Sequence, residues 1–317
     1  MRRHRTAAGT VLAVTTLLAG ALTATSAGAA PVPSPPSTPT PASFAPRQAP
    51  QGFWTAERMR AATPLDLMRV VPGSLKAPKP ASEKTVIGPT AFPQPGGPWT
   101  GGGAVVKTSG RVFFTFQGRT ASCSGNSVTS QNGSTVITAG HCVKYQGSWH
   151  TNWVFVPAYD NGQAPYGQWS ATKTLATDQW AASEDINYDV GAAVVAPLNG
   201  RTLAQTVGAQ GLQFNGGYNK AMYAFGFPAA DPYDGSKLIH CSGNSSKDFL
   251  FSKDHSLGCN MTGGSSGGPW FTSFSEATGT GLQVSVNSFG YTFLPNRMFG
   301  PYFGNEAKAV YDKAQTS

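Results

Sequence analysis

The nine residues Thr262-Gly-Gly-Ser-Ser-Gly-Gly-Pro-Trp270 hold four glycines and two serines. That composition alone is typical of a flexible loop. The order is more informative, because small residues on both sides of Ser266 let the backbone turn sharply and leave the hydroxyl unobstructed. The same turn can direct the N–H groups of Gly264 and Ser266 to one point, where they would stabilise an oxyanion. A serine presented in this way needs a base, and the base needs an acid to orient it.

The candidate bases are five histidines, and one of them stands in a distinctive setting. His141 lies in Thr138-Ala-Gly-His-Cys142, after an apolar run, with a glycine before it and a cysteine after it. Such neighbours can hold the backbone while the imidazole projects, and a general base needs that fixation because proton transfer works only within hydrogen-bond reach. The surroundings of His150, His240 and His255 are polar and loop-like, which predicts that these side chains are solvated.

The His141 and Ser266 motifs, in this order, resemble those of the chymotrypsin-fold serine peptidases. In that family the acid lies between the histidine and the serine, ahead of an apolar strand. Asp189 opens such a pattern in Tyr188-Asp-Val-Gly-Ala-Ala-Val-Val195 and is therefore the predicted acid. Asp185 is the competitor, although the residues that follow it fit the pattern less well.

The resemblance implies both a mechanism and a fold. His141 would take the proton of Ser266 as the serine attacks a peptide carbonyl, and Asp189 would orient the imidazole. The N–H groups of Gly264 and Ser266 would receive the oxyanion. The chain would be a serine endopeptidase without a metal or organic cofactor. Its fold class would be all-β, with two six-stranded antiparallel β-barrels and a short C-terminal helix.

Two alternatives to an active endopeptidase remain open at this point. A serine esterase of the α/β-hydrolase type would place its acid and its histidine after the serine, contrary to the order found here. A catalytically silent homologue that acts as a binding module would be expected to have lost a triad residue, and the sequence retains all three.

Within the family, the chain resembles the bacterial secreted branch that includes the glutamyl endopeptidases, over residues 86–317. Ser265 stands where trypsin-like members have an aspartate that pairs with the newly cut N-terminus, so that activation switch cannot operate here as such. The tetrapeptide Phe225-Gly-Phe-Pro228 resembles a Gly-aromatic-Pro element of the branch.

The resemblance also places the residues that would bind substrate. Asn260, six residues before the nucleophile, would form a pocket floor without the charge that selects lysine or arginine. Asn287 stands where the glutamyl branch has a histidine that helps to bind a carboxylate, and only Arg297 is near enough in sequence to replace it. Ser288-Phe289-Gly290 resembles the family's strand edge against which substrate adds, although a buried strand end is an equal interpretation. Together these residues predict a neutral pocket, unless an unaligned residue or the mature N-terminus supplies a charge.

The first 30 residues have the pattern of a secretory signal peptide. Arg2, Arg3 and Arg5 precede an apolar run from Val11 to Leu22, and small residues follow at Ala27-Gly-Ala29. The apolar run is too short to span a membrane comfortably, which disfavours an anchor. We therefore expect a secreted, extracellular protein.

Residues 31–85 form a Pro-rich linker and a predicted propeptide, which would make the chain a zymogen. Eight prolines between Pro31 and Pro50 predict an extended segment. After Phe53–Ala62, Thr63 and Pro64 have the pattern of an N-cap and a first helical residue. A small independent interaction module is the less favoured alternative. Val86-Ile-Gly88 resembles a mature start, although a start nearer Gly101 fits as well.

Four cysteines in an exported chain imply two disulfides with three possible connectivities. The family pattern suggests Cys123–Cys142, beside His141, and this leaves Cys241–Cys259 near the Ser266 loop. The alternative is a metal site, because histidines stand close to cysteines in sequence. No C-x-x-C pair exists and the expected compartment is oxidising, so disulfides are favoured.

The pattern of residues 86–317 is that of a β domain, which begins between Val86 and Val105. Many short strands separated by turn residues indicate a barrel or a sandwich. The predicted strands are rich in β-branched and aromatic residues and cover 111–116, 134–139, 153–156, 190–195, 221–225 and 281–286. Only the tail, about 305–314, has the pattern of an amphipathic helix.

The formal net charge of +8 gives little support to a nucleic-acid partner. Residues 1–84 carry ten Lys/Arg against three Asp/Glu, a balance of +7. Residues 85–317 carry thirteen against twelve, a balance of +1. The excess of positive charge therefore belongs to residues 1–84, the predicted signal peptide and propeptide, which we call the leader. The expected partners are protein or peptide substrates, with no nucleic acid, no membrane after signal cleavage, and a monomeric chain.

Overall fold

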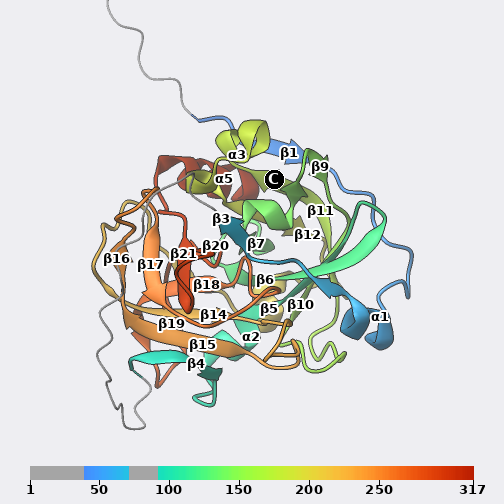
Figure 1. Cartoon of the computed structure of the whole chain (residues 1–317). Helices are drawn as coiled ribbons and strands as arrows, with labels where there is room; N and C mark the ends of the chain where they lie inside the picture. The colour runs from blue at the N-terminus through green and yellow to red at the C-terminus, as the bar shows by residue number, and fades with distance from the viewer. Residues whose placement is uncertain (1–38, 71–91) are drawn as a thin grey trace, which may run out of the picture. The chain divides into compact units, whose positions relative to one another are not determined.

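The computed structural model describes residues 39–70 and 92–317. The predicted signal peptide and the predicted mature start at Val86 lie outside the described residues. The described residues belong to one compact unit (Figure 1).

The first half of this unit is a closed six-stranded antiparallel barrel. Hydrogen-bonded pairs run from β5 through β6, β7, β12, β11 and β10 back to β5. Alternation along β5 explains the inside and outside of the barrel, because Val112 and Phe114 enter its core while Phe113 joins a separate apolar cluster. The strands are β5 (Ser109–Phe116), β6 (Arg119–Val128), β7 (Thr135–Thr138), β10 (Thr151–Pro157), β11 (Trp169–Ala176) and β12 (Gly191–Val195).

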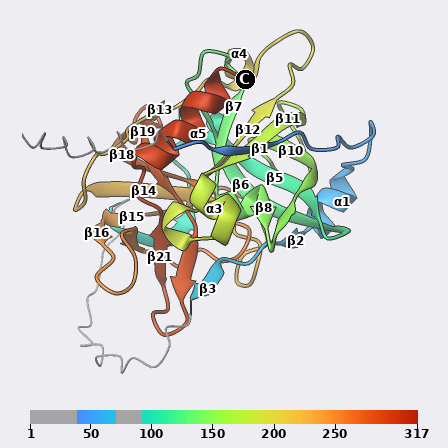
Figure 2. The same ribbon diagram turned by 90° about the horizontal axis from the view of Figure 1, so that it is seen from above.

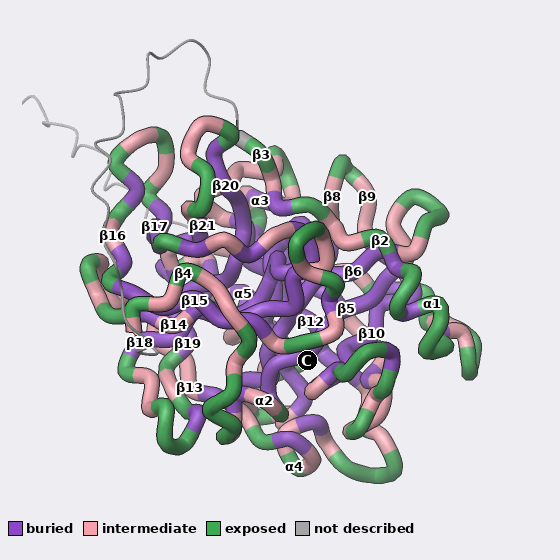
Figure 3. Tube along the Cα trace, turned by 60° about the horizontal axis from the view of Figure 1, so that its bottom comes forward, coloured by how far each residue is buried: buried purple, intermediate pink, exposed green. Residues whose placement is uncertain are grey.

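The second half, called the second barrel below, is built from two sheets that pack on each other. One contains β13 (Gly211–Leu212), β19 (Thr280–Val286), β18 (Pro269–Ser275), β14 (Ala221–Gly226), β15 (Ile239–Asn244) and β4 (Gln94–Pro98). The other contains β16 (Ser246–Lys247), β17 (His255–Gly258), β21 (Arg297–Gly300), β20 (Phe289–Tyr291) and β3 (Met68–Val70). Gly300 allows the two sheets to approach closely, since a Cβ at this position would stand 2.3 Å from the carbonyl oxygen of Val286. Buried positions concentrate inside both halves and exposed ones in the connections (Figure 3).

Short helices and one hairpin complete the peptidase part of the described chain. The hairpin is β8 (Lys144–Tyr145) with β9 (Ser148–Trp149). The predicted C-terminal helix is present as α5, and Ala307, Val310 and Ala314 pack on the core of the first barrel. The helices are α2 (Ala104–Thr108), α3 (Asp178–Ser183), α4 (Leu203–Val207) and α5 (Asn305–Gln315), with 3₁₀ turns at Gly140–Cys142 and Ile186–Tyr188.

The described part of the leader, residues 39–70, packs along the barrels. It contains β1 (Ala42–Phe44), α1 (Ala56–Ala61), β2 (Thr63–Pro64) and β3. Strand β1 pairs with β11, and α1 lies on the outer side of the first barrel (Figure 2). Trp54 and Met59 bury Phe113 on that side, and the indole of Trp54 donates to the carbonyl of Asn152 at 2.8 Å. This cover explains why β5 is apolar on both faces.

The structure corrects one expectation about the leader. Thr63 does not cap a helix, because Thr63–Pro64 pair with β6 and the helix before them is capped by Thr55. The Pro-rich segment is extended at Ala42–Phe44, as expected, and these residues also form a strand of the sheet. In both cases a neighbouring strand edge supplies backbone partners that local sequence cannot reveal.

Each of the six predicted strands is present, at β5, β7, β10, β12, β14 and β19. In the part of the chain that the structure describes, no helix has the length and apolar character needed to cross a membrane.

Candidate active site

Ser266 sits on a tight loop between β17 and β18. The loop is held by backbone bonds from the N–H of Ser265 to the carbonyl of Thr262, at 3.2 Å, and from that of Gly268 to Ser265, at 3.0 Å. The carbonyl oxygen of Ser266 accepts the N–H of Ser124, on β6, at 2.7 Å. The loop is thereby fixed to both barrels, while the hydroxyl of Ser266 is buried and has no hydrogen-bond partner.

Two glycines of the motif are needed for this turn. Gly264 and Gly267 have φ of 90° and 81°, in the region that glycine adopts without strain. Space is limited as well, because a Cβ on Gly267 would stand 2.1 Å from Oγ1 of Thr138. The glycines therefore place the Ser266 loop directly against the segment that carries His141.

His141 lies on the 3₁₀ turn that follows β7. Its Nδ1 is 2.7 Å from Oδ2 of Asp189, and its backbone N–H donates to Oδ1 of the same residue at 2.7 Å. A carboxylate can only accept, so Nδ1 carries the proton and Nε2 of the neutral ring is left free to accept one. Nε2 is buried and has no partner. Sγ of Cys142 is 3.6 Å from the carbonyl oxygen of Ser266, which brings the two segments together.

The competing acids have different surroundings. Asp189 has no exposed surface and also accepts the hydroxyl of Ser288 at 2.6 Å. Asp185 instead accepts the N–H and the side-chain amide of Asn187, at 3.0 and 2.9 Å, and caps a 3₁₀ turn. Only Asp189 therefore contacts the imidazole of His141. The contact with Ser288 was not predicted, because it joins residues 99 positions apart.

The imidazole of His141 lies among aromatic rings. The ring of Tyr145 lies 6.2 Å from that of His141, and the pKa of Tyr145 is raised by burial and by the charges of Glu184 and Asp189. His150 stacks on Phe114 at 4.3 Å, and its Nε2 is 2.9 Å from the carbonyl oxygen of His141. Burial lowers the pKa of His150 to about 3, so the ring is neutral and Nε2–H donates.

The expectation that the other described histidines are solvated is wrong. His150, His240 and His255 are between 0% and 5% exposed. Burial also lowers the pKa of His240, and that of His255 to about 4. They are covered by segments distant in sequence, as where His150 packs on Phe114 and His240 on Trp99, which a short window of sequence does not reveal.

The residues expected to bind substrate lie in three different environments. Asn260 is partly buried, and its Oδ1 accepts the hydroxyl of Tyr233 at 2.6 Å. Asn287 is fully buried. Its amide N–H groups donate to the carbonyls of Phe225 and Ser265, and its Oδ1 accepts the indole of Trp270. Both hydrogens of that amide are therefore used inside the protein.

The strand edge after Asn287 is occupied. Phe289, Gly290 and Tyr291 form β20, which pairs on one side with β21 and on the other with β3 of the leader. The guanidinium of Arg297 is held within the protein, since it donates to the hydroxyls of Ser246 and Ser256.

One of the two expected oxyanion donors is directed toward the leader. The N–H of Gly264 donates to the carbonyl oxygen of Leu65 at 2.9 Å. A Cβ on Gly263 would stand 2.9 Å from Oδ1 of Asp66, so the leader lies against the nucleophile loop itself. Local sequence gave no sign of this contact.

Both disulfides are as expected, Cys123–Cys142 and Cys241–Cys259. Within the described residues, the one group of three potential metal ligands is Cys123, His141 and Cys142. The two sulfurs are bonded to each other and offer no thiolate, and Nδ1 of His141 faces Asp189. The donor set therefore does not fit a metal ion.

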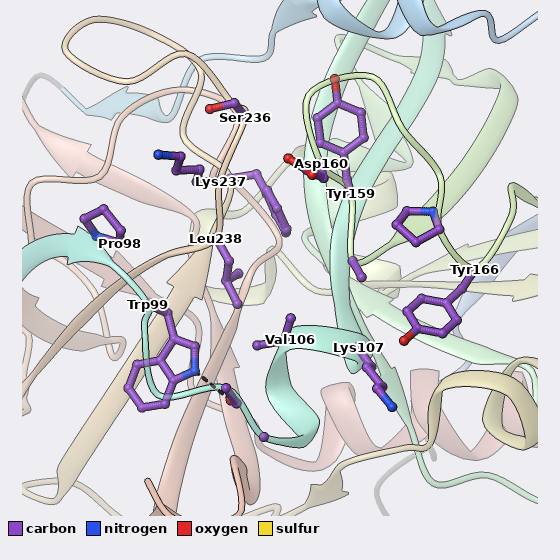
Figure 4. A pocket seen from close by; sticks show the side chains of 15 residues that line it. Pro98, Trp99, Val106, Lys107, Tyr159, Asp160, Tyr166, Ser236, Lys237 and Leu238 are labelled. Atoms are coloured by element: carbon purple, nitrogen blue, oxygen red, sulfur yellow. Dashed lines mark hydrogen bonds between the residues drawn. The ribbon is translucent and has the colours of Figure 1, made fainter.

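A cavity of about 590 Å³ lies away from these residues (Figure 4). Trp99 and Leu238 line one side of it, and Tyr159 and Tyr166 the other, and the Trp99 indole donates to the carbonyl of Gly102 at 2.8 Å. None of the predicted site residues lines this cavity.

The double-barrel fold and the Ser266 loop define a class of protein, and the chain belongs to it: the chymotrypsin-fold serine peptidases, which are serine endopeptidases. Anisep, a protease from Arthrobacter nicotinovorans, is 46% identical with a TM-score of 0.64, over 68% of this chain and 98% of Anisep. The thermostable serine protease AL20, from an extremophilic microorganism, is 43% identical with the same TM-score, over 68% of this chain and 99% of AL20.

More distant similarities add less. A Glu endopeptidase shares the fold at 16% identity and a TM-score of 0.56, over 70% of this chain and 97% of that structure. A curated protein, the "Extracellular metalloprotease" of Bacillus subtilis (strain 168), is 28% identical over 180 residues. The match covers 55% of this chain and 54% of that protein, so the chain spans about half the length of that relative. No family model matches the chain.

Proposed function

We propose that the chain hydrolyses peptide bonds through an acyl-enzyme formed on Ser266. His141 takes the hydroxyl proton as Ser266 attacks the carbonyl carbon, and returns it to the amine that leaves. Asp189 holds the proton on Nδ1 and stabilises the imidazolium that forms. The observation that carries this proposal is the Asp189–His141 pair at 2.7 Å, with Nε2 and the hydroxyl of Ser266 both unpartnered on adjoining segments.

The supporting residues have roles of their own in this proposal. The N–H groups of Gly264 and Ser266 receive the oxyanion. Ser288 orients Asp189 by donating to Oδ2, the same oxygen that faces His141 Nδ1, and Asn287 holds the loop by donating to the carbonyl of Ser265. Asn287 is thus proposed as a positioning residue and not as part of a substrate pocket.

The proposed specificity is for uncharged side chains. Asn260 and Tyr233 offer neutral hydrogen-bonding groups at the base of the second barrel, beside the apolar Met261. Two donors of the Arg297 guanidinium already bind serine hydroxyls, and a substrate carboxylate buried beside Asn260 without a cation would pay a desolvation cost.

We also propose that the chain is secreted and that residues 31 to about 85 are removed from it. About a third of the chain lies outside the match to Anisep and AL20, each of which is matched almost completely. N-terminal sequencing of the secreted enzyme tests this. A fully active form that begins at Pro31 would contradict it.

The test of the catalytic proposal is covalent labelling. A fluorophosphonate should modify the leader-free enzyme at one position, and peptide mapping should place the label on Ser266 together with loss of casein cleavage. A label on Ser265, or full cleavage by the labelled enzyme, would refute the assignment.

A further inference from the structure

The leader runs through the region where the candidate catalytic residues meet. On one side, β2 pairs in parallel with β6, with Pro64 opposite Ser122, and the N–H of Leu65 donates to the carbonyl of Ser122 at 2.9 Å. On the other side, β3 pairs in parallel with β20, with Met68 opposite Phe289. Between these pairings, the carbonyl of Leu65 accepts the N–H of Gly264.

The side chains of this segment are fitted to the site. Leu67 is 5% exposed and belongs to the apolar cluster of the second barrel that includes Cys259, Met261 and Met298. Met68 packs beside Phe289. Each of the four residues from Leu65 to Met68 therefore contacts a different part of the peptidase. Leu65 accepts from a backbone N–H and Asp66 lies against a glycine. Leu67 enters an apolar cluster and Met68 pairs with a strand edge.

With this segment in place, the candidate catalytic residues are inaccessible to solvent. His141, Asp189 and Ser266 have no exposed surface, although a nucleophile must be reached by its substrate. Attack on Leu65 would require the carbonyl carbon at Ser266 Oγ, the oxygen at the Gly264 N–H, and the N–H of Asp66 within reach of His141 Nε2. The second contact is made, and the third is not, since His141 Nε2 has no hydrogen-bond partner.

The polarity of the chain explains this partial fit. Along a peptide chain, each carbonyl carbon is preceded by its Cα and followed by the nitrogen that would leave on hydrolysis. A peptide can run in the opposite direction and still place a carbonyl oxygen at the N–H of Gly264. Its Cα then lies where the leaving nitrogen should be. The leader makes parallel pairs at both edges of the site. An edge that binds a strand by backbone bonds can accept either polarity, but only one polarity can be hydrolysed.

We propose that residues 63–70 are a tethered inhibitor that lies in the substrate cleft in the non-productive direction. This rests on the catalytic role proposed for Ser266. The cleft is filled by a peptide of the enzyme's own chain whose Leu65–Asp66 bond is not a substrate, and activity requires that this segment leave the cleft. The occupant of the cleft is thus an apolar segment of the leader, anchored by the side chain of Leu67.

Docking can be tested without activity. In the full chain carrying Ser266→Ala, the amides of residues 65–70 should exchange slowly with deuterium. Leu67→Asp in the same background should speed their exchange at least tenfold, because it places a charge in an apolar cluster. Ala61→Asp, at an exposed leader position, should leave it within about twofold. Rapid exchange of residues 65–70 without the Leu67 change would overturn the proposal.

Inhibition is tested with Ser266 intact. The rate of fluorophosphonate labelling is read from the mass of the uncut full chain. Leu67→Asp should label at least tenfold faster than the unmodified chain, and Ala61→Asp at the same rate. Equal rates for all three, or a leader cut at Leu65–Asp66, would overturn the proposal. If none labels even after the leader is digested away, the proposed function fails, while slow exchange at residues 65–70 would still report the docked segment.

Discussion

At the scale of single residues, the site separates two serines that the sequence places side by side. Ser265 donates its hydroxyl to the carbonyl of Thr262 at 2.7 Å, and Ser266 donates to nothing. The first hydroxyl is therefore used to close the loop and the second is left for chemistry. Similarly, both amide hydrogens of Asn287 are used in hydrogen bonds inside the protein, although its position in the sequence suggested a contact with substrate.

The neutral surroundings of Asn260 predict the substrate preference. The leader-free enzyme should cleave a diverse peptide library after apolar or uncharged polar residues. Asn260→Asp should add cleavage after lysine and arginine, because a charge at this position can pair with those side chains. A sharp preference of the unmodified enzyme for glutamate, or for lysine and arginine, would show that the pocket is elsewhere.

His150 predicts how stability depends on pH. Its pKa is about 3 in the folded protein against 6.5 when unfolded, because burial disfavours the charged ring. The unfolded chain therefore binds more protons between these values, and stability present above pH 6.5 is lost as the pH falls toward 3. The free energy of unfolding should decrease by about 1.4 kcal/mol per pH unit from this residue alone.

His150→Gln isolates this contribution, since glutamine can still donate to the carbonyl of His141. Urea unfolding between pH 6.5 and 4 should give a shallower pH dependence in the variant. His255, with a pKa of about 4, contributes in the same direction in both proteins. Parallel slopes would mean that His150 is not held neutral.

At the scale of secondary structure, β6 shows why part of the fold escapes sequence patterns. Its residues include three serines and an asparagine, and it is not among the predicted strands, yet most of these residues are buried. Several of their polar groups have distant partners: Ser122 accepts from Arg111, Ser124 donates to the carbonyl of Gly264, and the amide of Asn126 donates to Gln283. A polar central strand is stable because distant segments satisfy it, and those distant contacts are not encoded in a local window.

The predictable elements are those whose side chains decide their own burial. The run Val112–Phe116 is apolar and β-branched, and Asn305–Gln315 has one apolar face, so strand and helix follow directly. The triad candidates were predictable because glycine and cysteine mark the turns that hold them. The contacts of Ser288 and Leu65 were not, because each depends on a pairing between distant strands.

Comparing the two disulfides tests whether the Cys123–Cys142 bridge positions His141, the proposed base. They close 19 and 18 positions, for which chain entropy gives each about 3 kcal/mol of stability. Replacing Cys123 and Cys142 by alanine should lower kcat as well as stability, because Cys142 adjoins His141. Replacing Cys241 and Cys259 should cost similar stability but change mainly KM, because Cys259 adjoins Asn260. An unchanged kcat in the first variant at a permissive temperature would contradict this role.

At the scale of the whole molecule, the leader accounts for features that the peptidase part alone does not explain. It covers the outer face of β5 with Trp54 and Met59, adds a strand to the first barrel, and adds another to β20. The basic charge of the sequence also belongs to it, and residues 85–317 are almost neutral at +1 by formal count. A catalytic unit closed by its own leader is consistent with the absence of exposed surface at His141, Asp189 and Ser266.

The central claim is that Ser266 is the nucleophile and that its neighbour is structural. The most direct measurement compares kcat of leader-free Ser266→Ala and Ser265→Ala on one peptide substrate, with folding checked by circular dichroism. Ser266→Ala should reduce kcat by on the order of 10⁶, because the attacking group is gone. Ser265→Ala should stay within about tenfold of the unmodified enzyme, since one loop hydrogen bond is worth about 1 kcal/mol. Comparable activity in the two folded variants would contradict the account.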